Sequence, residues 1–78
     1  MAKEAAVKLL ERSIQFGHGR LSVVRLIMAI NSGAVISQEH WIYCSRVAAS
    51  SNDAITQALF LEATQGASGS FEMHHLAH

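Results

Sequence analysis

Only four charged side chains occur between residues 21 and 61 of this 78-residue chain, and they are Arg25, Glu39, Arg46 and Asp53. Apolar residues make up 50% of the chain and charged residues 15%, whereas about 25% of an average soluble domain is charged. A domain this small buries only roughly 60% of the surface that its unfolded chain exposes. The apolar side chains therefore exceed the space in one small core, and this excess restricts the folds and assemblies open to the chain.

The overall charge gives no preference for a polyanionic partner. Six Lys and Arg balance six Asp and Glu, so the formal net charge is zero, and we expect neither nucleic acid nor an acidic membrane surface as the main partner. The single cysteine, Cys44, excludes an internal disulfide, which is typical of a reducing compartment. The uncharged run between Arg25 and Glu39 is shorter than the roughly 18 residues of a spanning helix. We expect a soluble, cytoplasmic protein.

Helical periodicity and the placing of glycine predict an all-α protein of three to four short helices. The stretches "FGHG" (16–19), "NSG" (31–33) and "TQG" (64–66) each follow a run of helix formers, as helix ends do. No useful stretch alternates apolar and polar residues, so we expect no strands. The first helix is predicted over residues 3–16. The second is predicted over residues 22–31 with Ser22 as its N-cap, and Ser37 is predicted to cap the third.

The stretch "SSND" (50–53) lowers helix propensity, because these side chains compete for backbone hydrogen bonds. It predicts a break with a new N-cap at Ser51 or Asn52, although a single helix over residues 38–65 is the alternative. The last helix is predicted to carry Ile55, Ala58 and Leu59 on one face and to end at Gly66. The chain then divides into a helical domain, residues 1–66, and a flexible C-terminal tail, residues 67–78.

The second predicted helix is apolar on nearly all sides, so it must be buried on nearly all sides. One stripe contains Val23, Ile27 and Ile30, and the other contains Leu21, Val24 and Met28. A single thin core cannot cover both, and the surplus predicts a helical bundle completed by homo-oligomerisation, most simply a homodimer. A monomer with exposed leucines is the alternative. The predicted oligomer interface consists of Val23, Val24, Ile27, Met28 and Ile30.

Aromatic and apolar residues of the second half suggest a further contact with another protein. Trp41 is expected in the core, because its helical neighbours Cys44 and Val47 share its face. Tyr43 lies beside Arg46 on the polar side, and both residue types are enriched at interface hot spots. The predicted partner contacts are Ile42, Tyr43, Arg46, Phe60 and Leu61.

Residues 37–46 also suggest a helix-turn-helix, which makes a dimeric transcriptional regulator the alternative function. Ala29, Gly33, Ile36, Ser37 and Gln38 match elements of such motifs. The turn is about two residues longer than the usual 3–4. The predicted recognition helix offers DNA only Gln38, His40 and Arg46, while Glu39 would repel phosphate.

Neither a metal site nor a catalytic centre is expected. His40 and Cys44 are four residues apart, and His74 and His78 repeat that spacing, but structural zinc takes four ligands and Cys44 is the only thiol. Apolar neighbours should raise the pKa of Cys44, which argues against a nucleophile. We therefore expect no cofactor and no enzyme. The predicted function is a non-catalytic protein-interaction module (an adaptor, chaperone-like or regulatory protein) that acts as a helical homodimer and offers an apolar helical face to another protein.

Overall fold

A computed structural model describes the backbone of residues 2–76 and the side chains of residues 2–67. This part of the chain is all helical and contains no strand, which confirms the predicted class. The four helices are α1 (Lys3–Gln15), α2 (Gly19–Asn31), α3 (Gln38–Ser50) and α4 (Ala54–Leu76).

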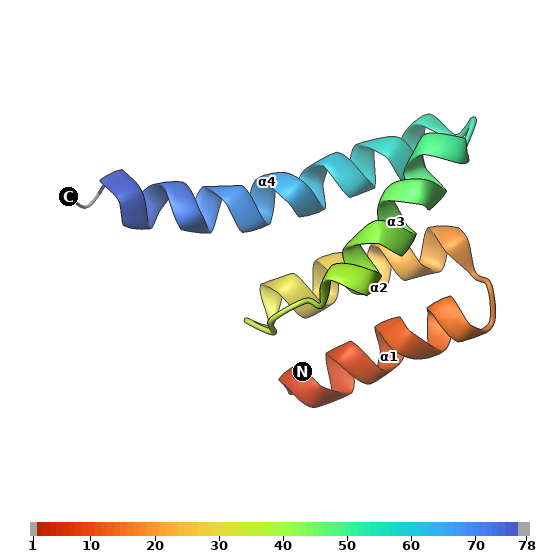
Figure 1. Ribbon diagram of the computed structural model, residues 1–78, viewed down its shortest axis with the longest axis horizontal. Coiled ribbons are helices and arrows are strands. Elements are labelled where there is room, and N and C mark those ends of the chain that lie inside the picture. Colours follow the sequence, from red (N-terminus) through yellow and green to blue (C-terminus); the bar gives the residue numbers. More distant parts are fainter. Residues whose placement is uncertain (1, 77–78) are drawn as a thin grey trace.

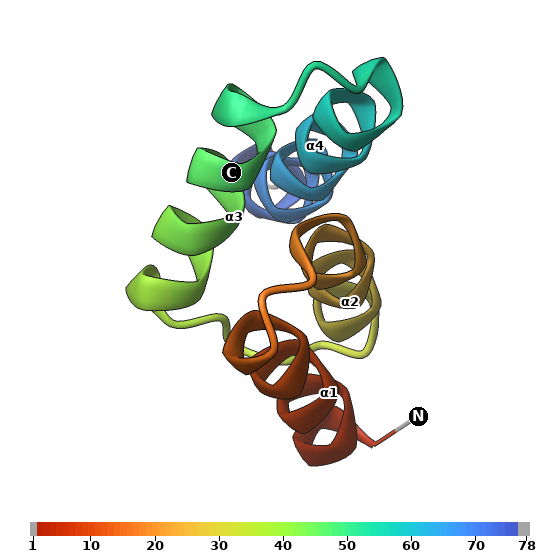
Figure 2. The ribbon, with the colours of Figure 1, turned by 90° about the vertical axis from the view of Figure 1, so that its right-hand side faces the viewer.

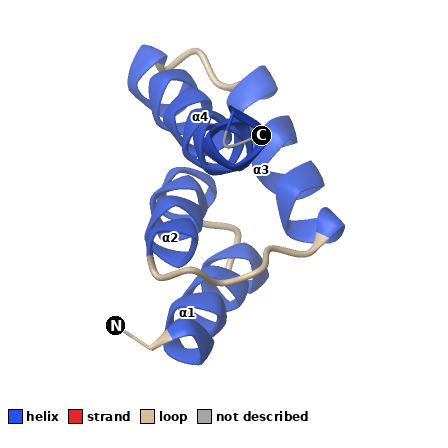
Figure 3. Cartoon of the chain, turned by 90° about the vertical axis from the view of Figure 1, so that its left-hand side faces the viewer, coloured by secondary structure: helices blue, strands red, loops and turns tan. Residues whose placement is uncertain are grey.

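Helix α2 is the centre of the arrangement, because it contacts all three other helices. Helices α1, α2 and α4 lie side by side, and α1 and α2 form an antiparallel hairpin (Figure 1). The two end views, Figure 2 and Figure 3, show α3 on one side of this row of helices and no helix on the other. Helix α4 continues past the rest of the molecule at its C-terminal end (Figure 1).

Two of the predicted helix ends are confirmed and the predicted start of α2 is wrong. Gly17 and Gly33 have φ angles of 72° and 87° and follow α1 and α2, in the left-handed conformation that glycine adopts most easily. Ser22 is not the N-cap of α2, because the helix begins at Gly19. The Ser22 hydroxyl is buried inside the helix and donates to the carbonyl of His18 at 2.8 Å.

Gly19, the first residue of α2, lies at a close contact with α3. A Cβ atom at this position would lie 3.0 Å from Cγ1 of Val47 on α3, which is closer than most such contacts. The absence of a side chain therefore lets the first turn of α2 pass close to α3. Sequence reasoning treated this glycine only as a helix stop.

The break between α3 and α4 is confirmed, so the single helix over residues 38–65 is excluded, but the cap differs from the prediction. Ser37 caps α3 as expected, since its Oγ accepts a hydrogen bond from the His40 amide at 3.4 Å. Asp53, not Ser51 or Asn52, caps α4. Its Oδ1 accepts from the Ile55 amide and its Oδ2 from the Thr56 hydroxyl, both at 2.9 Å.

The predicted end of the last helix at Gly66 is wrong, because α4 runs to Leu76. Gly66 does not have a positive φ angle. A glycine inside a helix costs only about 1 kcal/mol relative to alanine, so it does not force a stop. A Cβ atom at Gly66 would make an ordinary contact with Ile30 of α2, 3.8 Å away, so the helices also approach closely there. The division into a domain at 1–66 and a flexible tail at 67–78 stays a prediction.

The inward face of α4 also differs from the predicted one. Thr56 and Ala63 are buried and Leu59 is half-buried, whereas Ala58 is exposed and Ile55 is 54% exposed. Thr56 can be buried because its hydroxyl is satisfied by the Asp53 carboxylate. The cap therefore allows a polar residue to lie on the inward side of α4, which the apolar periodicity alone does not reveal.

The core of the described residues is thin and consists mostly of small side chains. None of the aromatic side chains that the structure describes is fully buried. Trp41 packs at the edge of the core, with its ring edge-on to Phe60 at 6.1 Å between ring centroids. The buried apolar residues are Ala6, Leu10, Val23, Leu26, Ala29, Cys44, Ala48 and Ala63.

The Asp53 cap gives a pH-dependent prediction. The hydrogen bond from the Ile55 amide, followed by that from Thr56, lowers the pKa of Asp53 below its ordinary value. A lowered pKa in the folded state means that the carboxylate stabilises the fold above the unfolded pKa and loses this effect as the pH falls. We expect Asp53→Ala to lower the melting temperature clearly at pH 7 and much less near pH 2. Asn52→Ala is the matched control. An equal shift at both pH values would contradict the assignment of the cap.

Candidate interaction surface

One side of α2 remains uncovered by the other helices. Gly19 and Val23 point toward α3 and the core, since the Cβ of Gly19 would meet Val47 and Val23 is fully buried. At about 100° per residue, Leu21, Val24 and Met28 fall on the opposite side of the helix. Leu21 is 40% exposed, and Val24 and Met28 are half-buried. This stripe matches one of the two apolar stripes of the sequence, and α3 does not cover it.

The neighbouring helices add apolar side chains to the same uncovered side. On α1, Leu9 and Phe16 line a hollow together with Leu21 of α2. On α4, Phe60 packs against Trp41 of α3, and Ile55 lies about 140° around the helix from Phe60. We call these side chains the open face; its members are Leu9, Phe16, Leu21, Val24, Met28 and Ile55.

Two adjoining hollows lie where α1 ends and α2 begins. Both are lined by His18 and Leu21, and they measure about 460 Å³ and 170 Å³. Phe16 stands at the smaller hollow with 61% of its surface exposed, and its ring centroid lies 6.4 Å from that of His18. The exposed ring of Phe16, the apolar Leu21 and the hollows together make a continuous apolar and concave area, which is typical of interaction sites.

Arginine side chains border these hollows. Arg20 lines the larger one, and Arg12 and Arg25 line the smaller one. Residues 12–38 contain these three arginines and no Asp or Glu. We call this surface the arginine corner; it consists of Arg12, Phe16, His18, Arg20, Leu21 and Arg25.

The arginines differ in the contacts that they make with other side chains of the same chain. Arg20 lies 3.6 Å from the Asp53 carboxylate and remains 59% exposed. Arg25 has no acidic neighbour among the described ion pairs; its Nη1 donates to Sδ of Met28, a weak acceptor, at 3.5 Å. Nε of Arg25 is buried and has no hydrogen-bond partner in the described part of the chain. The corner thus presents positive charge that the described side chains neutralise only partly.

The structure brings four of the five predicted interface residues to or near the surface. Val23 is fully buried in the core of its own chain, so it has no surface to offer a second copy. Val24 and Met28 belong to the open face. Ile27 and Ile30 are half-buried and line a groove of about 300 Å³ between α2 and α4.

The predicted partner contacts do not form one surface. Ile42 is 42% exposed and Arg46 is exposed one turn later on α3, while Leu61 is 56% exposed on α4. Tyr43 does not lie on the polar side as predicted, because it packs half-buried against the core, and so does Phe60. Phe16 and Ile55, which are 61% and 54% exposed, were not among the predicted contacts.

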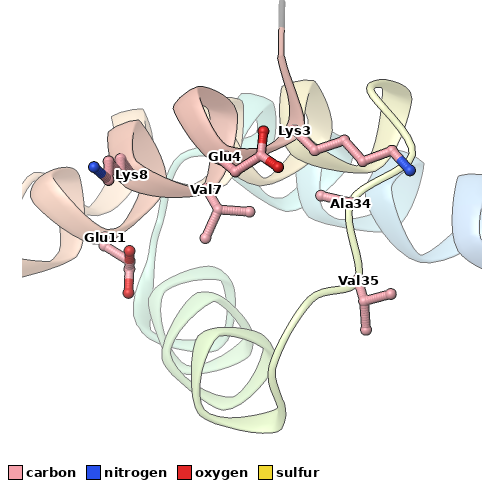
Figure 4. Close-up of a pocket in the computed structure, with 7 residues that line it drawn as sticks. All are labelled: Lys3, Glu4, Val7, Lys8, Glu11, Ala34 and Val35. Carbon is pink, nitrogen blue, oxygen red and sulfur yellow. The ribbon is translucent and has the colours of Figure 1, made fainter.

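A further hollow of about 350 Å³ lies between α1 and the loop before α3. Val7 points into it, Val35 extends from the loop at its rim, and charged side chains of α1 surround it (Figure 4). Val35 is 93% exposed. The surrounding charges are Lys3, Glu4, Lys8 and Glu11, two of each sign, so this hollow has no net preference for the charge of a ligand.

His40 and Cys44, the residues of α3 that were considered as metal ligands, pack against other parts of the chain. Nε2 of His40 lies 4.0 Å from the Glu11 carboxylate, and Nδ1 is buried with no hydrogen-bond partner among the described residues. Cys44 is buried, and burial raises the pKa of its thiol to about 11. The described residues contain no group of three or more His, Cys, Asp or Glu arranged to hold a metal. The side chains of His74 and His78 lie outside the described residues.

Comparison with known proteins found no matching family model, no significantly similar curated protein and no significantly similar solved structure. Within the described residues, none of the helices combines the length and the apolar character needed to cross a bilayer. The chemistry of the surface itself is therefore the basis for assigning a function.

The raised pKa of Cys44 leads to a second prediction. The folded state keeps the thiol protonated, whereas the unfolded chain releases its proton near pH 9, so stability is retained below that pH and lost as the pH rises toward about 11. We expect the wild-type chain to lose more stability between pH 7 and about pH 10 than Cys44→Ala does, measured by chemical denaturation. An identical loss in both proteins would contradict a buried neutral thiol.

Proposed function

We propose that the protein is a non-catalytic protein-interaction module that works as a homodimer. The observation that carries this proposal is the uncovered side of the α1–α2–α4 row. The row and α3 make two packed layers, and no helix of the described residues covers the other side of the row. The other side exposes Phe16, Leu21 and Ile55. A second copy packed beside the groove of Ile27 and Ile30 would cover Met28 and reinforce a thin core, in which four of the eight buried apolar residues that the structure describes are alanine. Phe16 and Leu21 lie toward the other end of α2, outside this contact.

The C-terminal half of α2 is the surface best suited to a second copy. Ile27 and Ile30 line the groove between α2 and α4, and Met28 follows on the open face. The polar groups beside this groove include Asn31, Glu62 and Gln65, which make a rim around an apolar centre, as in protein interfaces generally. A stable dimer buries roughly 800 Å² per partner. Of the predicted seam, Ile27, Met28 and Ile30 are retained. Val24 lies in the N-terminal half of α2 and lines the larger hollow at the start of that helix instead.

DNA binding through residues 37–46 stays the alternative. The exposed side chains of this segment include Gln38, Glu39 and Arg46, a single cation next to an acid. Six residues, 32–37, connect α2 to α3, which is longer than the usual 3–4 of a helix-turn-helix. Both features favour a protein partner over a nucleic acid.

The homodimer is tested best at Met28, because Ile27 packs against the core and its substitution would also disturb the fold. We expect Met28→Lys to place a cation in the seam and to weaken dimerisation by at least about tenfold, measured by sedimentation equilibrium. Ala49→Lys, an exposed change on α3, is the control and should leave the mass unchanged. A wild-type chain that sediments as a monomer at high micromolar concentration would refute the proposal.

The alternative function makes its own prediction at low salt. Phosphate contacts strengthen steeply as salt is removed, so a DNA-binding dimer should be retained on a heparin or DNA column at about 50 mM salt. We expect no retention there, and we expect Arg46→Ala to elute like the wild type. Retention that depends on Arg46 would favour the regulator.

A further inference from the structure

We propose that the arginine corner is a docking site for an acidic amphipathic helix of a different protein. This inference rests on the proposed function and deepens it, because it names the chemistry of the target and a surface separate from the dimer seam. The corner occupies the N-terminal half of α2 and the end of α1. The seam occupies the C-terminal half of α2 and the groove against α4.

The charges of the chain are separated in a way that selects an acidic partner. Arg12, Arg20 and Arg25 border adjoining hollows, and no acid occurs anywhere in residues 12–38. Glu11 is next to Arg12 in the sequence but lies at the opposite hollow and near His40 of α3. A partner with carboxylates on both sides of its contact stripe would reach guanidinium groups on both helices, and guanidinium–carboxylate pairs are the strongest of the charge-assisted hydrogen bonds.

The shape of the arginine corner favours a partner that carries large apolar side chains between its acidic residues. The two hollows meet at Leu21, and the exposed ring of Phe16 stands at one of them. One large aliphatic or aromatic side chain fits a hollow of about 170 Å³, and another, about a turn further along a helix, can enter the larger one. Apolar anchors at this spacing between acidic residues describe an amphipathic helix.

A second copy of the chain fits this corner poorly. Arg25 lies at the middle of α2, which spans Gly19–Asn31. A twofold pairing centred on this part of the open face would place Arg25 of one copy against Arg25 of the other, and like charges in contact cost several kcal/mol. A pairing centred on Ile27–Ile30 avoids this clash, so the same helix can serve a seam at one end and a target at the other.

An acidic lipid surface also fits less well than a peptide. Lipid recognition of this kind uses clusters of about four to eight Lys and Arg. The corner has three arginines, one of them already beside Asp53. Its apolar side chains line concave hollows, whereas membrane insertion needs them on a protruding surface.

The test uses the whole chain and a designed peptide. The probe is a fluorescein-labelled helical peptide with leucines three and four residues apart and glutamates on both sides of that stripe. We expect it to bind the wild-type chain, measured by fluorescence anisotropy, and we expect Arg12→Ala combined with Arg25→Ala to weaken binding by at least about tenfold. Arg46→Ala, which removes an exposed arginine on α3, should change the affinity less than twofold.

Two further controls keep the result unambiguous. The helicity of each variant is checked by circular dichroism. If the double variant loses helicity, Phe16→Asp replaces it in the test. Phe16 is 61% exposed, so its substitution should leave the fold intact. A peptide with lysines in place of the glutamates should not bind. Equal binding of both peptides, or no effect of the corner variants, would overturn the proposal. Binding to vesicles of phosphatidylcholine and phosphatidylserine without binding to the peptide would overturn it in favour of a membrane.

Sedimentation of the same samples separates this inference from the homodimer. A monomer that binds the acidic peptide through the corner would overturn the homodimer and support the docking site. A dimer that does not bind the peptide would support the homodimer and overturn the docking site. Peptide binding that persists in Gln65→Lys, a change at the exposed rim of the groove between α2 and α4, would support the assignment of two separate surfaces.

Discussion

The packing of α2 against the other three helices is the interaction on which the rest of the structure depends. Its inward side supplies Val23 and Leu26, two of the largest fully buried side chains of the described residues, and Leu10 of α1 is the third. Each such side chain stabilises the fold by about 1.5–3 kcal/mol when it is removed from water. The remaining core positions are mostly alanine and contribute much less apiece. Stability therefore depends on a few contacts around one helix, and α3 completes those contacts on one side only.

Small residues permit this close packing and also limit it. Gly19 lets α2 approach Val47 of α3, where a Cβ atom would lie only 3.0 Å away. At Gly66 a Cβ atom would make an ordinary contact with Ile30 of α2, so the packing there does not require glycine. Close approach of backbones leaves little volume for large side chains between the helices. The large apolar residues that the sequence provides are thus displaced to the edges and to the uncovered side. Three of the exposed large apolar side chains, Phe16, Leu21 and Ile55, lie on the open face, while Val35, Ile42 and Leu61 lie elsewhere on the molecule.

Much of the fold was predictable from local patterns. The all-α class, the ends marked by Gly17 and Gly33, the cap at Ser37 and the break at 51–53 depend on neighbouring residues, and the structure confirms them. The start of α2 at Gly19 and the passage of α4 through Gly66 were not predictable in this way. Glycine occurs both at helix ends and at close contacts between helices, so the residue type alone does not distinguish these two roles. Only the position of the neighbouring helix distinguishes them.

The candidate surface was predictable only in part, for a similar reason. The two apolar stripes of α2 are visible in the sequence, but which stripe faces the core depends on where α3 crosses. Val23 was assigned to the seam and fills the core instead, while the stripe of Leu21, Val24 and Met28 is left open. The inward side of α4 was misjudged because the carboxylate of Asp53 satisfies Thr56, a polar residue that periodicity places outside.

The proposed homodimer and the proposed docking site use different halves of α2, and the position of the charges is the reason. Arg25 stands at the centre of the helix, with Arg20 toward one end and the apolar groove of Ile27 and Ile30 toward the other. A symmetric contact must keep Arg25 away from its own symmetry mate, which moves a dimer seam toward the C-terminal half. The N-terminal half is then left with positive charge, an exposed aromatic ring and hollow surface, for which an acidic partner offers the best complement. In this proposal, one arginine in the middle of an apolar helix, without an acidic partner among the described residues, separates the self-contact from the contact with another protein.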